Sequence, residues 1–187
     1  MKRLVIAITG ASGSVYAKSL LRHVAPHYDQ LYAIMSENAI GIMREELGTE
    51  DLRSMLETPE KLTILDNANL GAPPASGSHR FDGMVVVPCS MGVAGRIAAG
   101  ISQDLVSRVA DVCLKEQRKL ILVPRESPLS VIHLENLLRL ARAGAVIMPA
   151  APPFYNKPQS IEELVNGITA RILAHLGIEQ DLVPEWK

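Results

Sequence analysis

The chain opens with Met1-Lys-Arg and continues Leu4-Val-Ile-Ala-Ile-Thr-Gly-Ala-Ser-Gly13, from which the architecture can be worked out. Residues 4–8 are apolar and rich in β-branched side chains, which predicts a strand buried on both faces and therefore a parallel sheet. The glycine- and hydroxyl-rich residues 9–14 then lead into a helical pattern. A strand, a turn of this kind and a helix are typical of the first unit of a doubly wound α/β fold.

Strand and helix patterns alternate along the rest of the chain. The further strands are predicted at residues 31–35, 84–87, 120–123 and 145–148, with a weaker candidate at 62–65. The helices are predicted at residues 15–24, 39–47, 105–114, 132–141 and 161–176, the last with Ser160 and Glu163 as a capping box. This order predicts a three-layer doubly wound sandwich with a mainly parallel sheet, Rossmann- or flavodoxin-like, whose ligand sites lie at the carboxyl ends of the strands.

Composition narrows the classes of protein. A chain of 187 residues favours one domain, which we expect to span 1–187. With 19 Lys and Arg against 20 Asp and Glu, the charge balance argues against a nucleic-acid partner. The apolar run after Arg3 is too short for a signal peptide or a membrane span. Cys89 and Cys113 lack ligand spacing, which predicts no metal site and favours a reducing, cytoplasmic setting.

The turn after the first strand has two interpretations. Its glycines can serve only the tight passage from strand to helix, or its amides and hydroxyls can bind a phosphate. A dinucleotide fingerprint is missing, because Val15 and Tyr16 stand where the third glycine is needed. Hydroxyls at Ser12, Ser14 and Ser36 suit a mononucleotide phosphate, as in flavodoxin-like proteins, better than NAD.

Two more predicted strand ends carry polar groups. The segment Pro88-Cys-Ser-Met-Gly92 is predicted as a small polar turn that receives a planar ring, with Cys89 more typical of a small core residue than of a nucleophile. The segment Val123-Pro-Arg-Glu-Ser-Pro128 holds a cation and a carboxylate between prolines, which limits the entropy lost in aiming them at a ligand. A solvated ion pair in a loop is the alternative for Arg125 and Glu126.

Other cations and a tyrosine suit a second phosphate. Arg108 and Lys115 lie seven residues apart on one predicted helix and share a face, and Arg171 lies on the last helix. Each alone is typical of a solvated charge, but together with Arg125 they suit a phosphate. Tyr155 adds a hydroxyl, although its ring can also simply pack a loop. The five histidines are dispersed, and we assign none of them a catalytic role.

The order of these motifs resembles one family. The segments that carry the resemblance are Thr9-Gly-Ala-Ser-Gly13, Ala72-Pro-Pro-Ala-Ser-Gly-Ser78, Pro88-Cys-Ser90, Arg108-x-Ala-Asp111, Leu114-Lys-Glu116, Leu122-Val-Pro-Arg-Glu126, Ile132-His-Leu-Glu-Asn136 and Pro152-x-Phe-Tyr155. They cover nearly the whole chain and resemble the UbiX-type flavin prenyltransferases, many of which carry older labels as aromatic-acid or polyprenyl-hydroxybenzoate decarboxylases.

The resemblance implies a reaction without a metal. Reduced FMN is alkylated at N5 and then C6 by dimethylallyl monophosphate, which releases phosphate, and a partner decarboxylase consumes the prenylated FMN. By motif, the FMN contacts are expected at Gly10, Ala11, Ser12, Ser36, Ser90, Met91, Gly92, Val93 and Arg125. The prenyl phosphate contacts are expected at Arg108, Lys115, Tyr155, Arg171 and Trp186. The expected catalytic residues are Glu126, Ser12 and Lys115.

The resemblance also implies an assembly. We expect a homo-oligomer, a dodecamer by analogy, with sites at subunit interfaces and some of the cations donated by a neighbour. Glu126 is the expected proton carrier, and the ring of Trp186 would shield the allylic cation. Some relatives carry an aromatic residue where this chain has Leu70, a departure that bears on the wall of the prenyl pocket.

Two alternatives stay open from the sequence. An FMN-dependent decarboxylase of cysteinyl compounds would share the architecture but typically carries an Asn in the motif after the fourth strand and a catalytic His on an early helix; here His23 and His27 come late in the first predicted helix. A non-catalytic flavin carrier would need one phosphate site, whereas the cations around Arg125 suit two.

Overall fold

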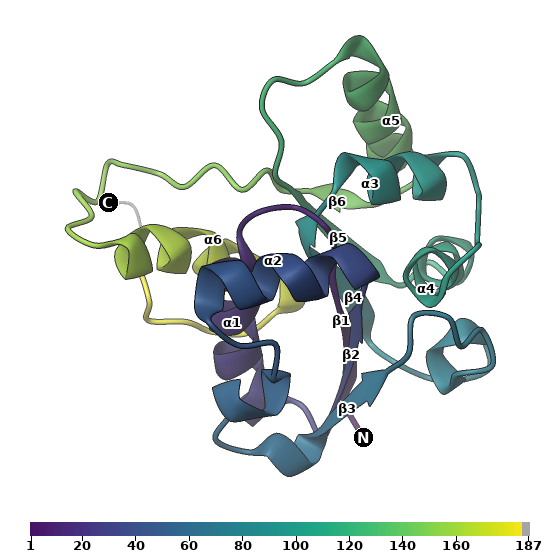
Figure 1. The fold of residues 1–187 in the computed structure, drawn as a ribbon, viewed down its shortest axis with the longest axis horizontal. Helices are drawn as coiled ribbons and strands as arrows, with labels where there is room; N and C mark the ends of the chain where they lie inside the picture. Colours follow the sequence, from purple (N-terminus) through teal and green to yellow (C-terminus); the bar gives the residue numbers. More distant parts are fainter. Residues whose placement is uncertain (185–187) are drawn as a thin grey trace.

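The computed structural model describes residues 1–184 and places one sheet at the centre of the chain (Figure 1). The six strands pair in the order β3-β2-β1-β4-β5-β6, and every neighbouring pair is parallel. The strands are β1 (Arg3–Ile8), β2 (Gln30–Met35), β3 (Leu62–Leu65), β4 (Gly83–Cys89), β5 (Lys119–Pro124) and β6 (Val146–Ile147). The predicted doubly wound α/β sandwich with a parallel sheet is therefore confirmed.

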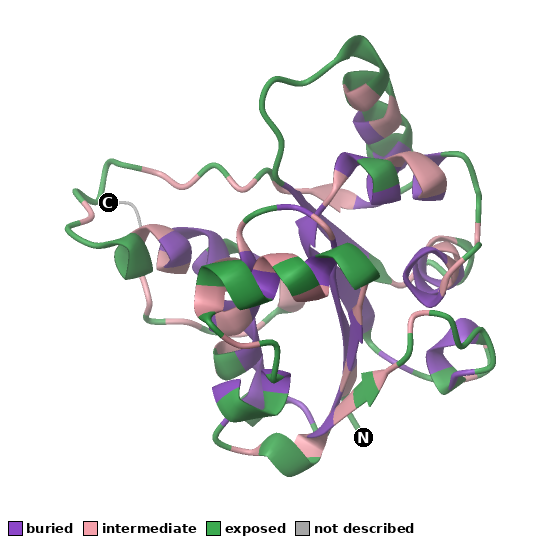
Figure 2. Cartoon of the chain, viewed as in Figure 1, coloured by how far each residue is buried: buried purple, intermediate pink, exposed green. Residues whose placement is uncertain are grey.

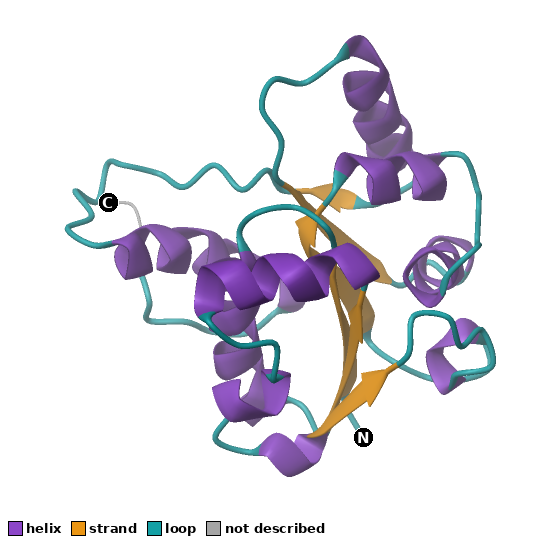
Figure 3. Cartoon of the chain, in the orientation of Figure 1, coloured by secondary structure: helices purple, strands orange, loops and turns teal. Residues whose placement is uncertain are grey.

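Helices cover both faces of this sheet (Figure 3). On one face lie α1 (Ser14–Val24), α2 (Glu37–Leu47) and α6 (Ile161–Leu176), and on the other lie α3 (Met91–Ala98), α4 (Leu105–Lys115) and α5 (Val131–Arg142). Short 3₁₀ turns are η1 (Ala25–His27), η2 (Leu52–Met55), η3 (Pro59–Lys61) and η4 (Pro73–Ala75). Within residues 1–184, no helix combines the length and the apolar character that crossing a membrane requires.

Strand β1 contributes to both cores, as its unbroken apolar run predicts. Leu4, Ile6 and Ile8 pack on the side of α1 and α6, whereas Val5 and Ala7 pack on the side of α3 and α4. All five side chains are fully buried, and Figure 2 shows the sheet as the most buried part of the molecule. Burial of alternate residues in opposite cores fixes the register of the strand, because a shift by one residue would exchange the two sets.

Three local predictions need correction. The polar turn expected at 88–92 is shorter, because β4 continues to Cys89 and Ser90 caps an eight-residue helix, α3, that the sequence analysis missed. The capping box of α6 is only half formed: Ser160 Oγ accepts from Glu163 N at 3.1 Å, but the Glu163 carboxylate accepts from Gln159 N instead of Ser160 N. Finally, β6 contains two residues rather than four.

The strand order determines where a ligand site can form. From β1 the sheet grows in both directions, to β2 on one side and to β4 on the other, so the connections that leave β1 and β4 diverge. The crevice outside the carboxyl ends of such strands is the usual ligand site of doubly wound folds. Ser12, Ser36, Ser90 and Arg125 all follow the carboxyl ends of their strands and therefore share this edge.

Candidate functional site

The turn between β1 and α1 requires glycine at two positions. Gly13, the N-cap of α1, has φ of 114°, and a Cβ built there would lie 3.0 Å from the ring of Tyr16. A Cβ on Gly10 would lie 2.7 Å from Cβ of Asn38, in the first turn of α2. Glycine therefore serves both backbone conformation and close packing here. The turn is held against the start of α2, and the predicted binding residue Ala11 is buried within it.

The start of α1 is bonded by a carboxylate, Glu46, that was not predicted from the sequence. Glu46, near the end of α2, accepts hydrogen bonds from the amides of Gly13 at 3.0 Å and Ser14 at 2.7 Å. Burial raises its pKa, but the hydrogen bonds from Ser12, Ser14 and Gly13 outweigh that effect and hold the pKa of Glu46 below its ordinary value. Glu46 therefore supplies the anion that the N-terminus of α1 favours, at the amides of Gly13 and Ser14.

Ser36 offers a better position for a phosphate. It is the N-cap of α2, and its amide donates to Ile8 O at 3.0 Å, which places it beside the end of β1. Its hydroxyl makes no capping hydrogen bond and, within residues 1–184, is buried without a partner. A buried hydroxyl without a partner is costly unless a ligand or water completes it. A hydroxyl donor at a helix N-terminus fits the phosphate of a mononucleotide such as FMN.

The end of β4 forms the opposite side of the crevice. Ser90 caps α3, where its Oγ accepts from Val93 N at 3.4 Å. Met91 and Val93 point into the core, whereas Gly92 is exposed, with open space where its Cβ would be. The start of α3 thus presents backbone rather than side chains to a flat ligand. Cys89 is fully buried in the core, as predicted, and this burial raises the pKa of its thiol to about 12.

Arg125 links the end of β5 to the β1 turn. Its Nε donates to the carbonyl of Ser12 at 3.0 Å, and its amide donates to Cys89 O at 3.3 Å. Glu126 follows it as an exposed residue, with its carboxylate accepting from Ser127 N at 3.1 Å. The predicted cation and carboxylate therefore lie at the same edge as Ser12, next to the turns that follow β1 and β4.

Lys115 is not brought to this edge within the chain, and Arg108 is bonded to the 72–78 loop. Arg108 donates to Ala75 O at 3.0 Å and pairs with Asp111. Lys115 ends α4 and pairs with Glu116 beside the 72–78 loop, close to the amino end of β5. Because Arg125 follows the carboxyl end of the same strand, Lys115 and Arg125 lie at opposite edges of the sheet.

The remaining predicted residues lie on the later part of the chain. The 149–160 segment runs as an extended loop from β6 to α6 (Figure 1). Tyr155 in this loop is exposed, and so is Arg171 on α6. Leu70, at the site of the departure from the family, is exposed before η4. Trp186 lies outside the described residues.

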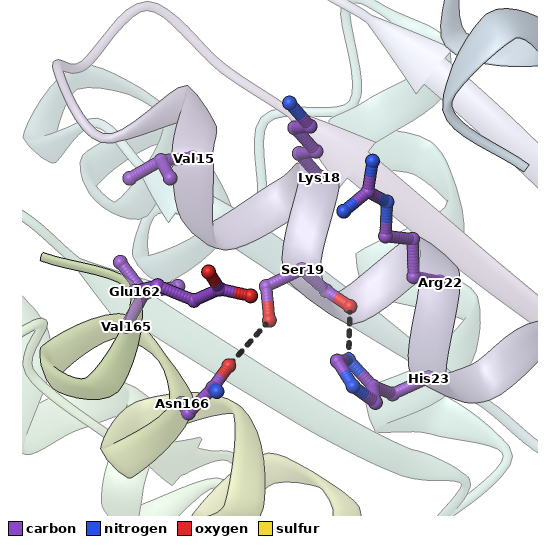
Figure 4. Close-up of a pocket in the computed structure, with 8 residues that line it drawn as sticks. All are labelled: Val15, Lys18, Ser19, Arg22, His23, Glu162, Val165 and Asn166. Carbon is purple, nitrogen blue, oxygen red and sulfur yellow. Dashed lines mark hydrogen bonds between the residues drawn. The ribbon is translucent and has the colours of Figure 1, made fainter. Parts of the chain in front are cut away.

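A separate pocket lies between α1 and α6 (Figure 4). It measures about 180 Å³, and Lys18, Arg22, His23 and Glu162 supply its charged and titratable side chains. None of the predicted site residues lines it. His23 Nδ1 donates to the Ser19 carbonyl at 2.7 Å, in the part of α1 that leads away from the β1 turn. His23 therefore lies at the far end of α1 from Ser12, and His27 lies beyond it in η1.

Comparisons with known proteins find relatives over nearly the whole chain. A family model described as Flavoprotein matches residues 1–173. Flavin prenyltransferase LpdB of Lactiplantibacillus plantarum is 47% identical over 188 residues, covering 100% of this chain and 99% of the relative. Flavin prenyltransferase UbiX of Methanocaldococcus jannaschii is 43% identical over 186 residues, covering 98% of each chain.

Solved structures extend the match to three dimensions. The crystal structure of AnUbiX (PadA1) in complex with FMN and dimethylallyl pyrophosphate has a TM-score of 0.92 at 38% identity, covering 100% of this chain and 97% of that chain. A dodecameric FMN-dependent UbiX-like decarboxylase from Escherichia coli O157:H7 has a TM-score of 0.90, also at 38% identity, covering 99% of each. The chain belongs to the UbiX-type flavin prenyltransferases, a family of FMN-binding enzymes.

Proposed function

We propose that this protein transfers a dimethylallyl group from dimethylallyl monophosphate to N5 and C6 of reduced FMN, giving prenylated FMN and phosphate. The observation that carries the proposal is the meeting of the β1, β2, β4 and β5 ends at one sheet edge, where Arg125 is hydrogen-bonded to the β1 turn. Reduced FMN supplies the nucleophilic atoms, and the protein's residues position the reactants and manage charge and protons.

Three segments would hold the flavin nucleotide. The unpartnered hydroxyl of Ser36 and the N-terminus of α2 suit its phosphate. The backbone of residues 10–12 would lie beside the phosphate, because Gly10 has no side chain to block a close approach. Residues 90–93 present the exposed backbone at Gly92. We propose that these contacts hold the flavin nucleotide without a metal.

The second half of the site handles the prenyl phosphate. Breaking its carbon–oxygen bond leaves negative charge on the phosphate, which cations placed in advance stabilise as the charge develops. We assign this to Arg108, Lys115 and Arg171, with Arg125 alongside and the hydroxyl of Tyr155 as a further contact. Glu126 is the proton carrier, because alkylated N5 and C6 must each lose a proton and Glu126 is a carboxylate at the flavin edge.

Assembly would complete this half. Lys115 lies at the amino edge of the sheet, so a neighbouring copy is needed to bring it to the flavin edge of another chain. Exposed apolar side chains support an assembly: Val131 and Ile132 at the start of α5 are 69% and 68% exposed, and Phe154 is 71% exposed. Figure 2 shows α5 as largely exposed. Apolar patches of this kind mark contact surfaces, and we propose a dodecamer with sites between subunits.

Two further proposals follow from the reaction. Prenylated FMN is a cofactor rather than an end product, so we propose that a separate decarboxylase receives it. We also propose that the protein works in the cytoplasm. A reducing compartment keeps the flavin reduced and keeps thiols such as Cys89 and Cys113 free.

The direct test is an anaerobic incubation of the protein with reduced FMN and dimethylallyl monophosphate. We expect a flavin heavier by one five-carbon unit together with free phosphate, measured by mass spectrometry and a phosphate assay. Glu126→Gln should slow adduct formation by about 10² or more while FMN affinity stays unchanged. Addition of a chelator should leave the rate unchanged. Unaltered FMN beside an active control enzyme would contradict the proposal.

A further inference from the structure

Thr9 connects the ends of β1 and β4 where the pairing of these strands stops. The β1–β4 register runs from Leu4 opposite Gly83 to Ala7 opposite Val86 and goes no further. Beyond it, the Thr9 amide donates to Pro88 O at 3.2 Å, and the Thr9 hydroxyl donates to the same carbonyl at 2.9 Å. The Ser90 amide in turn donates to Thr9 Oγ1 at 2.7 Å. The Thr9 side chain therefore supplies hydrogen bonds between the two strand ends at the point where their backbone pairing stops.

The chemistry of this position is demanding. Pro88 has no N–H and offers only its carbonyl, which accepts from both the amide and the hydroxyl of Thr9. Ser90 presents an N–H and needs an acceptor. A hydroxyl is the small neutral group that donates and accepts at once, and Thr9 is only 1% exposed, so water does not replace either bond. An apolar residue here would remove the acceptor of the half-buried Ser90 amide, which is destabilising where water cannot replace it.

The two hydrogen bonds act on both sides of the flavin crevice. Gly10 follows Thr9 directly, so the hydroxyl anchors the start of the β1 turn. Ser90 is the N-cap of α3, so the same hydroxyl holds the point from which α3 begins. Both segments are among those proposed to contact FMN. Their separation is thus set by a buried group that reaches no ligand itself.

We propose that Thr9 is a positioning residue, which fixes the β1 turn and the start of α3 relative to each other before FMN binds. The inference rests on the proposed FMN contacts at Gly10–Ser12 and Ser90–Val93. It does not rest on prenyl transfer, and it assigns Thr9 no contact with either substrate. A crevice that is already ordered binds its ligand more tightly, because binding does not have to supply the free energy of ordering the two segments.

The experiment compares Thr9→Val with Thr9→Ser and with the control Thr169→Val. Valine keeps the shape of threonine but neither donates nor accepts, whereas serine keeps both functions. Thr169 is also fully buried and donates to Ser19 Oγ at 2.9 Å, but it lies between α6 and α1, away from the crevice. Affinity for oxidised FMN is measured by flavin fluorescence, and stability by urea unfolding without FMN.

We expect Thr9→Val to weaken FMN binding by about tenfold or more, Thr9→Ser to restore it, and Thr169→Val to lower stability with FMN affinity unchanged. Equal, small losses of FMN affinity in Thr9→Val and Thr169→Val would overturn the proposal, because the role would then be stability alone. Since no prenyl donor is present, this outcome is independent of whether the protein transfers a prenyl group.

A measurement on the unmodified protein keeps the proposal testable if Thr9→Val does not fold. Amide hydrogen exchange at Ser90 should be slow both without and with FMN, because Thr9 holds this amide in either state. Fast exchange of the Ser90 amide without FMN, with protection only after FMN is added, would show that the ligand and not Thr9 orders the crevice, and would overturn the proposal.

Discussion

The flavin side of the site and the prenyl-phosphate side are built in different ways. Ser12, Ser36 and Ser90 follow parallel strands of one sheet, so one chain brings them together. Lys115 and Arg125 lie at opposite edges of that same sheet, so one chain keeps them apart. In the proposed site, nucleotide binding is therefore a property of the fold, whereas stabilisation of the leaving phosphate is proposed to depend on how copies of the fold assemble.

The largest effect is expected at Lys115. Lys115→Gln should lower the rate of prenyl transfer by about 10² to 10³, the usual loss when one group that stabilises a developing oxyanion is removed. FMN affinity should stay unchanged, because Lys115 is proposed to contact the prenyl phosphate and not the flavin nucleotide. Single-turnover kinetics and a flavin titration separate the two quantities. If FMN affinity fell as much as the rate, Lys115 would contribute to flavin binding as well, which would contradict the separation of the two sides.

A smaller effect is expected at Ser36 and should fall on the flavin side alone. Ser36→Ala removes a donor proposed for the FMN phosphate, which should weaken FMN binding by about tenfold or more. Riboflavin, which lacks the phosphate, serves as the matched control and should bind both proteins alike. Stability without ligand should be equal or higher, since the alanine removes a buried hydroxyl without a partner. An equal loss for riboflavin would place the phosphate elsewhere.

The smallest effect is expected at Glu46. Glu46→Gln should destabilise the protein by about 1 kcal/mol, because a neutral amide interacts less well with the start of α1, and solvent screening keeps the value modest. The folded protein holds the pKa of Glu46 below the ordinary 4.5, so its contribution is present above that pH and is lost as pH falls through the lower folded value.

Urea unfolding at a series of pH values measures this contribution. The stability difference between the native protein and Glu46→Gln should shrink on acidification below pH 4.5. A difference that stays constant across this range would mean that the charge of Glu46 is not what stabilises the turn.

Much of the fold was predictable because its signals are local. The apolar β-branched runs and the helical periods specify the strands and most of the helices without knowledge of distant contacts. Helix α3 was missed because Gly92 and Gly95 lower helix propensity, and only its cap, Ser90, marks it. The half-formed capping box of α6 shows the same limit, since Glu163 had two backbone donors within reach and bonds the Gln159 amide.

The site was predictable where it follows the strand ends and not where it depends on distant partners. Ser36 and Arg125 directly follow strands and Ser12 lies in the turn after β1, so the sequence pattern alone predicts their place at this edge. Glu46 was missed because 33 residues separate it from Gly13, and only the packing of α2 on α1 brings them together. Thr9 was visible as part of the glycine turn, but its bonds to Pro88 and Ser90 exist only once β1 and β4 pair.

The central claim, that one copy supplies the flavin edge and another supplies Lys115, is tested most directly by mixing variants. Chains carrying Lys115→Gln and chains carrying Glu126→Gln are co-expressed with different tags, and mixed assemblies are purified through both. Random assembly leaves about a quarter of the sites with native Lys115 and native Glu126, so we expect activity to recover to about a quarter of the native rate.

The matched control mixes Arg125→Ala with Glu126→Gln, two changes at the same edge of one chain, and should recover no activity. Recovery in the first mixture and none in the second is the result that the account predicts. No recovery in the first mixture, from assemblies that bind FMN normally, would contradict it, because Lys115 and Glu126 would then have to serve the site from the same chain.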